Sequence, residues 1–243
     1  MLSIKNLEKF TKQAQTSIQN VVREYCQHLF LSYLYERPDS ERMLFKGGTA
    51  LRILLRSPRY SEDLDFTGIN LTQQKIEDMF IGTLAEVERA GVEVRLTEAK
   101  KTTGGYLGIA EFRAYEKKIP LQIEVSSRYT KSLKGVRTIV ENEYITAYTL
   151  VHLPIEEIIQ GKLAAMASRH KARDFYDYFF LLSGNYPIVK EKENLTNALA
   201  LLKASRINFR SDLQGLLPQS HARYLRDFKS ILEQKILTFN HFP

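Results

Sequence analysis

Three extended runs that follow one another in the middle of the chain constrain its fold most strongly. They are Val92–Ala99, Tyr106–Tyr115 and Ile119–Ser127, and turn-prone residues join them. Runs of this kind, bounded by turn signals, are typical of strands. We therefore expect a sheet in the middle of the chain.

Helical patterns lie on both sides of this sheet. On its N-terminal side, apolar spacing predicts helices over residues 4–36, 43–56 and 72–90. Thr72 can cap the last of these, and Gly91 follows its end. A short strand at Asp63–Thr67 and an extended run at about 137–148 are also expected. From Pro154 onward the pattern is helical, over 154–169, 172–183, 189–205 and 219–238.

This order of elements predicts an α+β fold, in which a mixed sheet with flanking helices is followed by a C-terminal helical bundle. The weakest link between the two parts lies around Ala147–Leu153. We therefore predict an N-terminal α/β domain over residues 1–148 and a C-terminal helical domain over residues 149–243.

Composition narrows the classes of protein that fit. Cys26 is the only cysteine, so an intrachain disulfide and a four-cysteine zinc site are excluded. No run of about 18 apolar residues occurs, and the first ten residues lack the apolar core of a signal peptide. We expect a cytoplasmic protein without membrane contact. The net charge of +7 is compatible with a polyanionic partner.

The strongest chemical signal joins a glycine pair to a pair of acids. Gly47 and Gly48 stand where a helix is expected to begin, so backbone N–H groups there can approach a phosphate. Asp63 and Asp65 alternate with Leu64 and Phe66, which places both carboxylates on one face of the short strand. Two such carboxylates repel each other unless a cation lies between them, and Mg²⁺ prefers oxygen ligands of this kind. Each element alone has a plainer explanation, a solvated acidic pair or a simple turn.

Together these residues resemble the polymerase-beta-like nucleotidyltransferase superfamily. The strings Lys46-Gly47-Gly48-Thr49-Ala50-Leu51 and Ser61-Glu62-Asp63-Leu64-Asp65-Phe66 are similar to one branch, the AbiEii/AbiGii-type nucleotidyltransferase toxins. A second block supports this branch, with Lys162-Leu163-Ala164-Ala165 followed by Arg169-His170-Lys171-Ala172-Arg173-Asp174-Phe175-Tyr176-Asp177. The two blocks span residues 45 to 177, about half of the chain, and the resemblance implies a nucleotidyltransferase-like sheet domain.

The resemblance also implies roles for individual residues. Asp63 and Asp65 would bind the metal, with Glu124 as the third acid, because Leu121, Ile123 and Val125 alternate with it. Lys162 would contact the triphosphate, and Asp174 would assist it. The remaining residues expected at the nucleotide are Lys46, Gly47, Gly48, Thr49, Ser61, Arg173 and Asp177. Simpler alternatives are a surface Glu124, a solvent-reaching Lys162, and helix-start charges at Asp174 and Asp177.

The implied activity is nucleotidyl transfer with Mg²⁺, or Mn²⁺ in its place, and a nucleoside triphosphate (NTP) as substrate. Family precedent makes RNA the acceptor, in particular the tRNA 3′ end, so that translation is blocked. It also implies a cognate antitoxin within a toxin–antitoxin or phage-defence pair. Two alternatives stay open: transfer of a nucleoside monophosphate (NMP) onto a protein hydroxyl, and a catalytically silent module that binds RNA or a partner.

Two groups of basic residues could contact an RNA backbone. The first lies between residues 100 and 137 and comprises Lys100, Lys101, Arg113, Lys117, Lys118, Arg128, Lys131, Lys134 and Arg137, interleaved with Tyr106, Tyr115 and Tyr129. The second lies in the C-terminal helices and comprises Arg206, Arg210, Arg223, Arg226 and Lys229. A solvated basic surface is the plainer interpretation of both.

Overall fold

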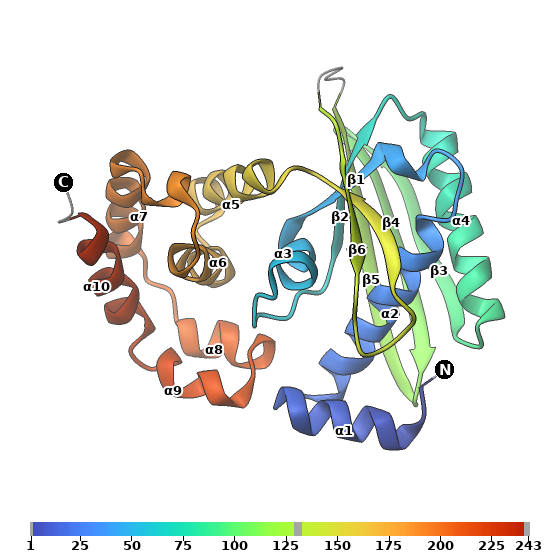
Figure 1. The fold of residues 1–243 in the computed structure, drawn as a ribbon, viewed down its shortest axis with the longest axis horizontal. Helices are drawn as coiled ribbons and strands as arrows, with labels where there is room; N and C mark the ends of the chain where they lie inside the picture. The colour runs from blue at the N-terminus through green and yellow to red at the C-terminus, as the bar shows by residue number, and fades with distance from the viewer. Residues whose placement is uncertain (1, 129–132, 241–243) are drawn as a thin grey trace. The chain divides into compact units, whose positions relative to one another are not determined.

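The computed structural model describes residues 2–128 and 133–240 and divides the chain into two compact units (Figure 1). Unit 1 comprises Met1–Arg56 and Tyr60–Pro154, and unit 2 comprises Ser57–Arg59 and Ile155–Pro243. The short segment Ser57–Arg59 thus belongs with unit 2, although the chain before and after it belongs to unit 1. No described helix is long and apolar enough to cross a membrane.

A mixed sheet forms the centre of unit 1. Within the described residues it has seven strands in the order β3-β4-β5-β2-β1-β7-β6. The strands are β1 (Met43–Lys46), β2 (Leu64–Ile69), β3 (Glu93–Thr102), β4 (Gly105–Ala114), β5 (Lys117–Arg128), β6 (Val136–Val140) and β7 (Tyr148–His152). The β2–β5 and β1–β7 pairs are parallel, and the other pairs are antiparallel.

The helices of unit 1 are α1 (Ile4–Ala14), α2 (Ile18–Leu34), α3 (Gly47–Leu55) and α4 (Gln73–Arg89), with a short 3-10 helix η1 (Ser40–Arg42). Helices α2 and α4 lie along one face of the sheet (Figure 1). Along β4 every second side chain, from Tyr106 to Phe112, is buried, and Tyr106 contacts the ring of Phe80 on α4. The intervening residues, such as Leu107, therefore face the other side, which carries the candidate site.

Unit 2 is helical in its described part. Its helices are α5 (Ile155–Arg169), α6 (Ala172–Ser183), α7 (Lys192–Ala204), α8 (Phe209–Leu213), α9 (Ala222–Leu225) and α10 (Phe228–Asn240), with the 3-10 helices η2 (Pro187–Lys190), η3 (Gln214–Leu216) and η4 (Gln219–His221). Aromatic rings form its core: Phe209 lies 5.9 Å from Phe175 and 4.9 Å from Phe228, and Tyr176 stacks on Phe228. The helices α6, α8 and α10 pack together through these rings.

The predicted α+β class, with a nucleotidyltransferase-like sheet followed by a helical bundle, is confirmed, and so is helix α4. Thr72 caps α4 by accepting a hydrogen bond from the Lys75 N–H. The predicted domain boundary at residues 148 and 149 stays a prediction. Residue 148 begins strand β7, which lies in unit 1.

Four predicted elements were wrong in detail. Residues 4–36 form two helices, because Gln15 adopts a left-handed conformation (φ 49°) and Ser17 starts a new helix by capping the Asn20 N–H. Residues 43–46 form strand β1 and not a helix, since they pair with both β2 and β7. The extended run predicted near 137–148 covers β6, the non-strand segment 141–147 and only the first residue of β7, which pairs antiparallel with β6. The last predicted helix is divided among η4, α9 and α10.

Candidate active site

A glycine corner and an acid lie in direct contact in unit 1. Strand β1 ends at Lys46, and Gly47 turns the chain into α3 with φ +85°, a conformation that glycine adopts without steric cost. A Cβ atom at Gly47 would lie 2.0 Å from Oδ2 of Asp65, which is too close for any side chain. The Asp65 carboxylate therefore packs against the backbone where α3 begins.

The sheet register brings Lys46, Asp65 and Glu124 into one row. Lys46 on β1 pairs with Asp65 on β2, and Asp65 pairs with Glu124 on β5. Glu124 in turn pairs with Leu107 on β4. Residues that pair directly across neighbouring strands have side chains on the same face. The acid predicted from the alternation of β5 thus lies on the strand next to Asp65.

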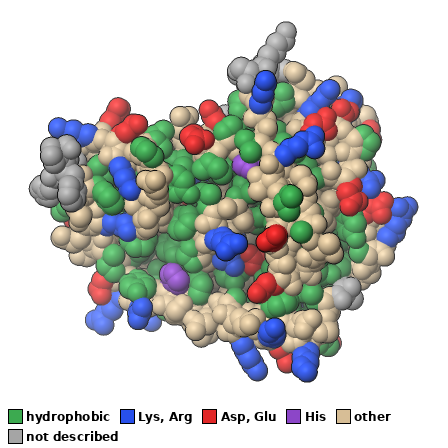
Figure 2. All heavy atoms as spheres, viewed as in Figure 1, with side chains coloured by type: hydrophobic (Ala, Val, Ile, Leu, Met, Phe, Trp, Pro, Cys, Tyr) green, Lys and Arg blue, Asp and Glu red, His purple; other side chains and the backbone are tan. Residues whose placement is uncertain are grey.

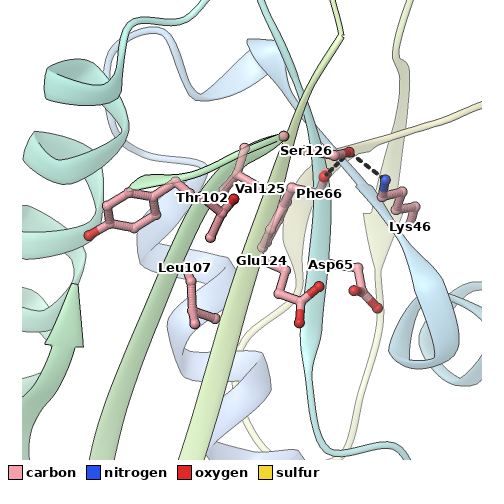
Figure 3. A pocket seen from close by; sticks show the side chains of 10 residues that line it. Lys46, Asp65, Phe66, Thr102, Leu107, Glu124, Val125 and Ser126 are labelled. Atoms are coloured by element: carbon pink, nitrogen blue, oxygen red, sulfur yellow. Dashed lines mark hydrogen bonds between the residues drawn. The ribbon is translucent and has the colours of Figure 1, made fainter. Parts of the chain in front are cut away.

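A pocket of about 340 Å³ lies over this row. Its lining includes Lys46, Asp65 and Glu124, and it extends toward Thr102 and Leu107 on the outer strands β3 and β4. Figure 3 shows the carboxylates of Asp65 and Glu124 extending from adjacent strands to the same side. The Gln122 amide donates a hydrogen bond of 2.5 Å to Glu124, which fixes the orientation of that carboxylate.

Lys46 contributes a cation to this pocket. Its Nζ donates a hydrogen bond of 2.6 Å to Oγ of Ser126, and that hydroxyl donates to the carbonyl oxygen of Phe66 at 3.1 Å (Figure 3). Ser126, which the motifs did not single out, thus holds the Lys46 ammonium at the pocket that the two acids also line. A cation here favours an anionic ligand such as a phosphate.

The segment that leads into β2 is held by buried polar side chains. The Thr49 hydroxyl, buried in α3, donates a hydrogen bond of 2.5 Å to the carbonyl of Asp63. From the buried Gln27 on α2, the amide donates to the carbonyls of Ser61 and Glu62 at 3.0 and 3.3 Å. Thr49 therefore positions Asp63 through the backbone. Neither Thr49 nor Ser61, nor Gly48 or Asp63, is among the described residues that line the pocket.

The acids offer a site for a hard divalent cation. Carboxylate oxygens from Asp65 and Glu124 share the pocket, and Asp63 precedes the same strand by one residue. No three described His, Cys, Asp or Glu residues are close enough together to form a metal cluster. Mg²⁺ commonly uses only one or two carboxylates and completes its coordination with water and phosphate oxygens. The donor set therefore fits Mg²⁺ bound together with a nucleotide.

The residues predicted from the second block lie in unit 2, where two of them, Lys162 and Asp177, form a cluster with Arg59. The guanidinium of Arg59 donates two hydrogen bonds to Asp177, at 2.7 and 2.9 Å, and Nζ of Lys162 lies 2.8 Å from the same carboxylate. Burial raises the pKa of Asp177, but the charges of Arg59 and Lys162 outweigh it and hold that pKa at about 2. Two cations share one anion, so the cluster keeps a positive charge.

Asp174 has a local role at the start of α6. Its buried carboxylate accepts a hydrogen bond from the Lys171 N–H at 3.2 Å, and it lies 2.6 Å from Nη2 of Arg169. Arg173, which precedes Asp174 in the chain and was also predicted at the nucleotide, is half-buried. Asp174 thus caps the N-terminus of α6. This contact agrees with the simpler alternative given for Asp174, a favourable negative charge at the start of a helix.

Arg59, Gln27 and Ser126 are the supporting residues that the motifs missed. Arg59 stands four residues before Asp63, and its proximity to that motif was the only available signal. Gln27 lies in the helix predicted over residues 4–36, where a buried amide needs a hydrogen-bond partner. Nothing in the sequence pairs Ser126 with Lys46, because that contact depends on strand order.

Comparisons with known proteins agree with this fold. MenT4, a nucleotidyltransferase toxin from Mycobacterium tuberculosis H37Rv, is similar to this chain with a TM-score of 0.70 and 16% identity, over 100% of this chain and 91% of that chain. JHP933 from Helicobacter pylori is similar with a TM-score of 0.57 and 21% identity, over 93% of this chain and 97% of that chain. A search of the curated proteins gives no match.

These likenesses define the class as a nucleotidyltransferase fold. The family model of the nucleotidyl transferase AbiEii toxin of type IV toxin–antitoxin systems matches residues 29–239. The chain therefore belongs to the AbiEii nucleotidyltransferase toxin family, and the resemblance identified from the two motif blocks is confirmed. Membership implies a nucleotide substrate and an antitoxin partner.

Proposed function

We propose that this toxin transfers an NMP from an NTP to an RNA acceptor, with a tRNA 3′ end as the target, and that it uses Mg²⁺. The observation that carries the proposal is the row Lys46–Asp65–Glu124 beside the Gly47 corner. The pocket combines a cation with two hard carboxylates, and the Gly47 corner packs against one of those carboxylates. These are the groups that phosphoryl transfer needs for positioning and charge stabilisation.

The order of residues along the row suggests on which side of Asp65 each substrate would bind. In an in-line displacement the attacking oxygen and the leaving group lie on opposite sides of the phosphorus. The Gly47 corner and Lys46 lie on the β1 side of Asp65, where they would bind the triphosphate tail. On the other side are Glu124 and then Leu107, where the acceptor hydroxyl would enter. The site therefore favours entry of the acceptor across β5 and β4.

In the proposed reaction the acceptor oxygen forms a bond to the α-phosphorus. The bond from that phosphorus to the bridging oxygen breaks, and pyrophosphate leaves. Glu124 would take the proton of the acceptor hydroxyl. Asp65 and Glu124 would hold Mg²⁺, whose charge would stabilise the attacking and leaving oxygens. Asp63, which is not among the described residues of the pocket lining, stays a predicted ligand from the family resemblance. From the family resemblance we further expect Lys162 and Arg173 of unit 2 to contact the triphosphate.

The test is incubation of the purified toxin with tRNA, Mg²⁺ and each NTP labelled at the α-phosphate. We expect label in RNA, release of pyrophosphate, and an extended 3′ end on sequencing. Asp65→Asn should lower the rate at least ~100-fold, because it removes a carboxylate that would hold Mg²⁺. The control is Asp78→Asn, the same change on the exposed surface of α4, which should act as wild type. Label in protein would support the protein-hydroxyl alternative, and no transfer at all would overturn the proposal.

A further inference from the structure

A second cavity lies in unit 2 among the C-terminal helices. It has a volume of about 420 Å³ and is bordered by Arg206, Arg210, Arg226 and Lys229, with Phe209 and Leu225 also in its lining. This volume lies in the range of ligand sites in proteins, ~300–1,000 Å³. Every charged residue that lines it is basic.

The three arginines at this cavity are available to a ligand. Arg206, Arg210 and Arg226 are exposed, and none of them forms an ion pair with any residue in the described part of the chain. Lys229 differs, because its Nζ donates to the carbonyls of Lys203 and Ser205, at 3.2 and 2.8 Å. The site thus presents three uncommitted guanidinium groups, which bind phosphate oxygens in a bidentate manner.

The charge of the whole chain is concentrated in this unit. Unit 2 contains 14 Lys and Arg against 9 Asp and Glu, whereas unit 1 contains 21 against 19. Unit 2 therefore carries +5 of the net +7. Figure 2 shows Lys and Arg side chains on the surface that carries α9. A concentrated positive field of this kind attracts polyanions.

The other basic group, between residues 100 and 137, is a weaker candidate. Lys100 pairs with Glu98, and Arg113 pairs with both Glu93 and Glu111. Acids therefore offset the charges of Lys100 and Arg113, whereas the arginines of the C-terminal cavity have no such partner among the described residues. Tyr129 and Lys131 lie outside the described residues, as does the side chain of Arg128.

We propose that the cavity bordered by Arg206, Arg210 and Arg226 binds phosphate groups of the RNA acceptor, away from its reacting end. The inference rests on the proposed function, since it takes RNA as the acceptor. Phe209 is only 5% exposed and packs against Phe175 and Phe228, so it has no free face on which a base could stack. The site therefore reads the RNA backbone and not the base sequence.

The test compares two triple variants that each remove three positive charges. The cavity variant is Arg206→Gln, Arg210→Gln and Arg226→Gln. The control is Lys5→Gln, Lys9→Gln and Lys192→Gln, at exposed positions on α1 and α7. Binding of bulk tRNA is measured by fluorescence anisotropy from 50 to 300 mM salt, and KM and kcat for labelled transfer are measured alongside.

We expect the cavity variant to bind tRNA at least tenfold more weakly at low salt. Its slope of log K against log salt should be shallower by about 2 to 3, because each lost phosphate contact removes roughly 0.7 to 0.9. Its KM for tRNA should rise while kcat at saturation stays unchanged. Arg210→Gln alone should show about one third of the change in slope, so the effect is measurable even if the triple variant were unstable.

Three outcomes would overturn the proposal. The cavity variant could bind tRNA as wild type does, or both triple variants could lose the same affinity, which would indicate only a diffuse effect of net charge. The cavity variant could also lose binding to a partner protein while tRNA binding is kept. In each case wild-type transfer to RNA would leave the proposed function intact, whereas a wild-type toxin that labels no RNA would fail the proposed function itself.

Discussion

At the scale of single residues, Gly47 is the position where the site tolerates least change. Alanine there would hold a left-handed conformation that costs about 1–2 kcal/mol, and its Cβ would displace the Asp65 carboxylate. A displacement of about 1 Å in a reacting group can lower a rate ~100-fold. We therefore expect Gly47→Ala to lose at least that much transfer activity, in the labelled-NTP assay, while the folded protein persists.

Gly82→Ala is the matched control for this substitution. Gly82 lies within α4, and a Cβ there would meet Arg37 at 3.5 Å, an ordinary contact. Alanine in a helix is favoured over glycine by about 0.5–1 kcal/mol, so this variant should be slightly more stable and fully active. Full activity of Gly47→Ala would show that the corner does not control Asp65.

At the scale of elements, the ion pairs of Asp177 hold Ser57–Arg59 to helices α5 and α6. Asp177→Asn would leave Arg59 and Lys162 buried beside each other with no carboxylate between them. Breaking a buried pair in this way typically costs about 3–5 kcal/mol. We expect that loss in the free energy of unfolding, measured with urea. Asp212→Asn, at an exposed position in α8, should change it little, and a loss below about 1 kcal/mol in Asp177→Asn would contradict the role of the cluster.

The helices and strands also differ in how far the sequence could predict them. Helix α4 and strands β3 to β5 followed from periodicity and caps, because their signals are local. The faces of Asp65 and Glu124 followed from alternation, but their pairing did not, since strand order depends on contacts between distant segments. Strand β1 is only four residues long, and it forms because it pairs with β2 on one side and with β7 on the other. Arg59 joins a residue 118 positions away, which no spacing rule reveals.

At the scale of the whole molecule, the two units carry different groups that respond to acid. In unit 1 His28 is buried, and its Nδ1 lies 2.9 Å from the Tyr148 hydroxyl. Burial lowers the pKa of His28 to about 4. In unit 2 the cluster of Asp177 lowers the pKa of that carboxylate to about 2. Each shift means that the unfolded chain takes up a proton at a higher pH than the folded chain does.

The sign of the pH dependence follows from these two shifts. As the pH falls from about 6.5 to about 4, unfolded His28 is protonated and folded His28 is not, so the free energy of unfolding falls by roughly 3 kcal/mol. Below about pH 4 the same argument applies to Asp177, whose stabilisation is lost toward pH 2. Urea unfolding at pH 7.5, 6, 5 and 4 should therefore show a decline that His28→Asn flattens. His170→Asn, at an exposed position whose φ of 53° asparagine tolerates, should keep the wild-type decline. If His28→Asn declined as steeply as wild type, buried His28 would not be the source of the acid sensitivity of unit 1.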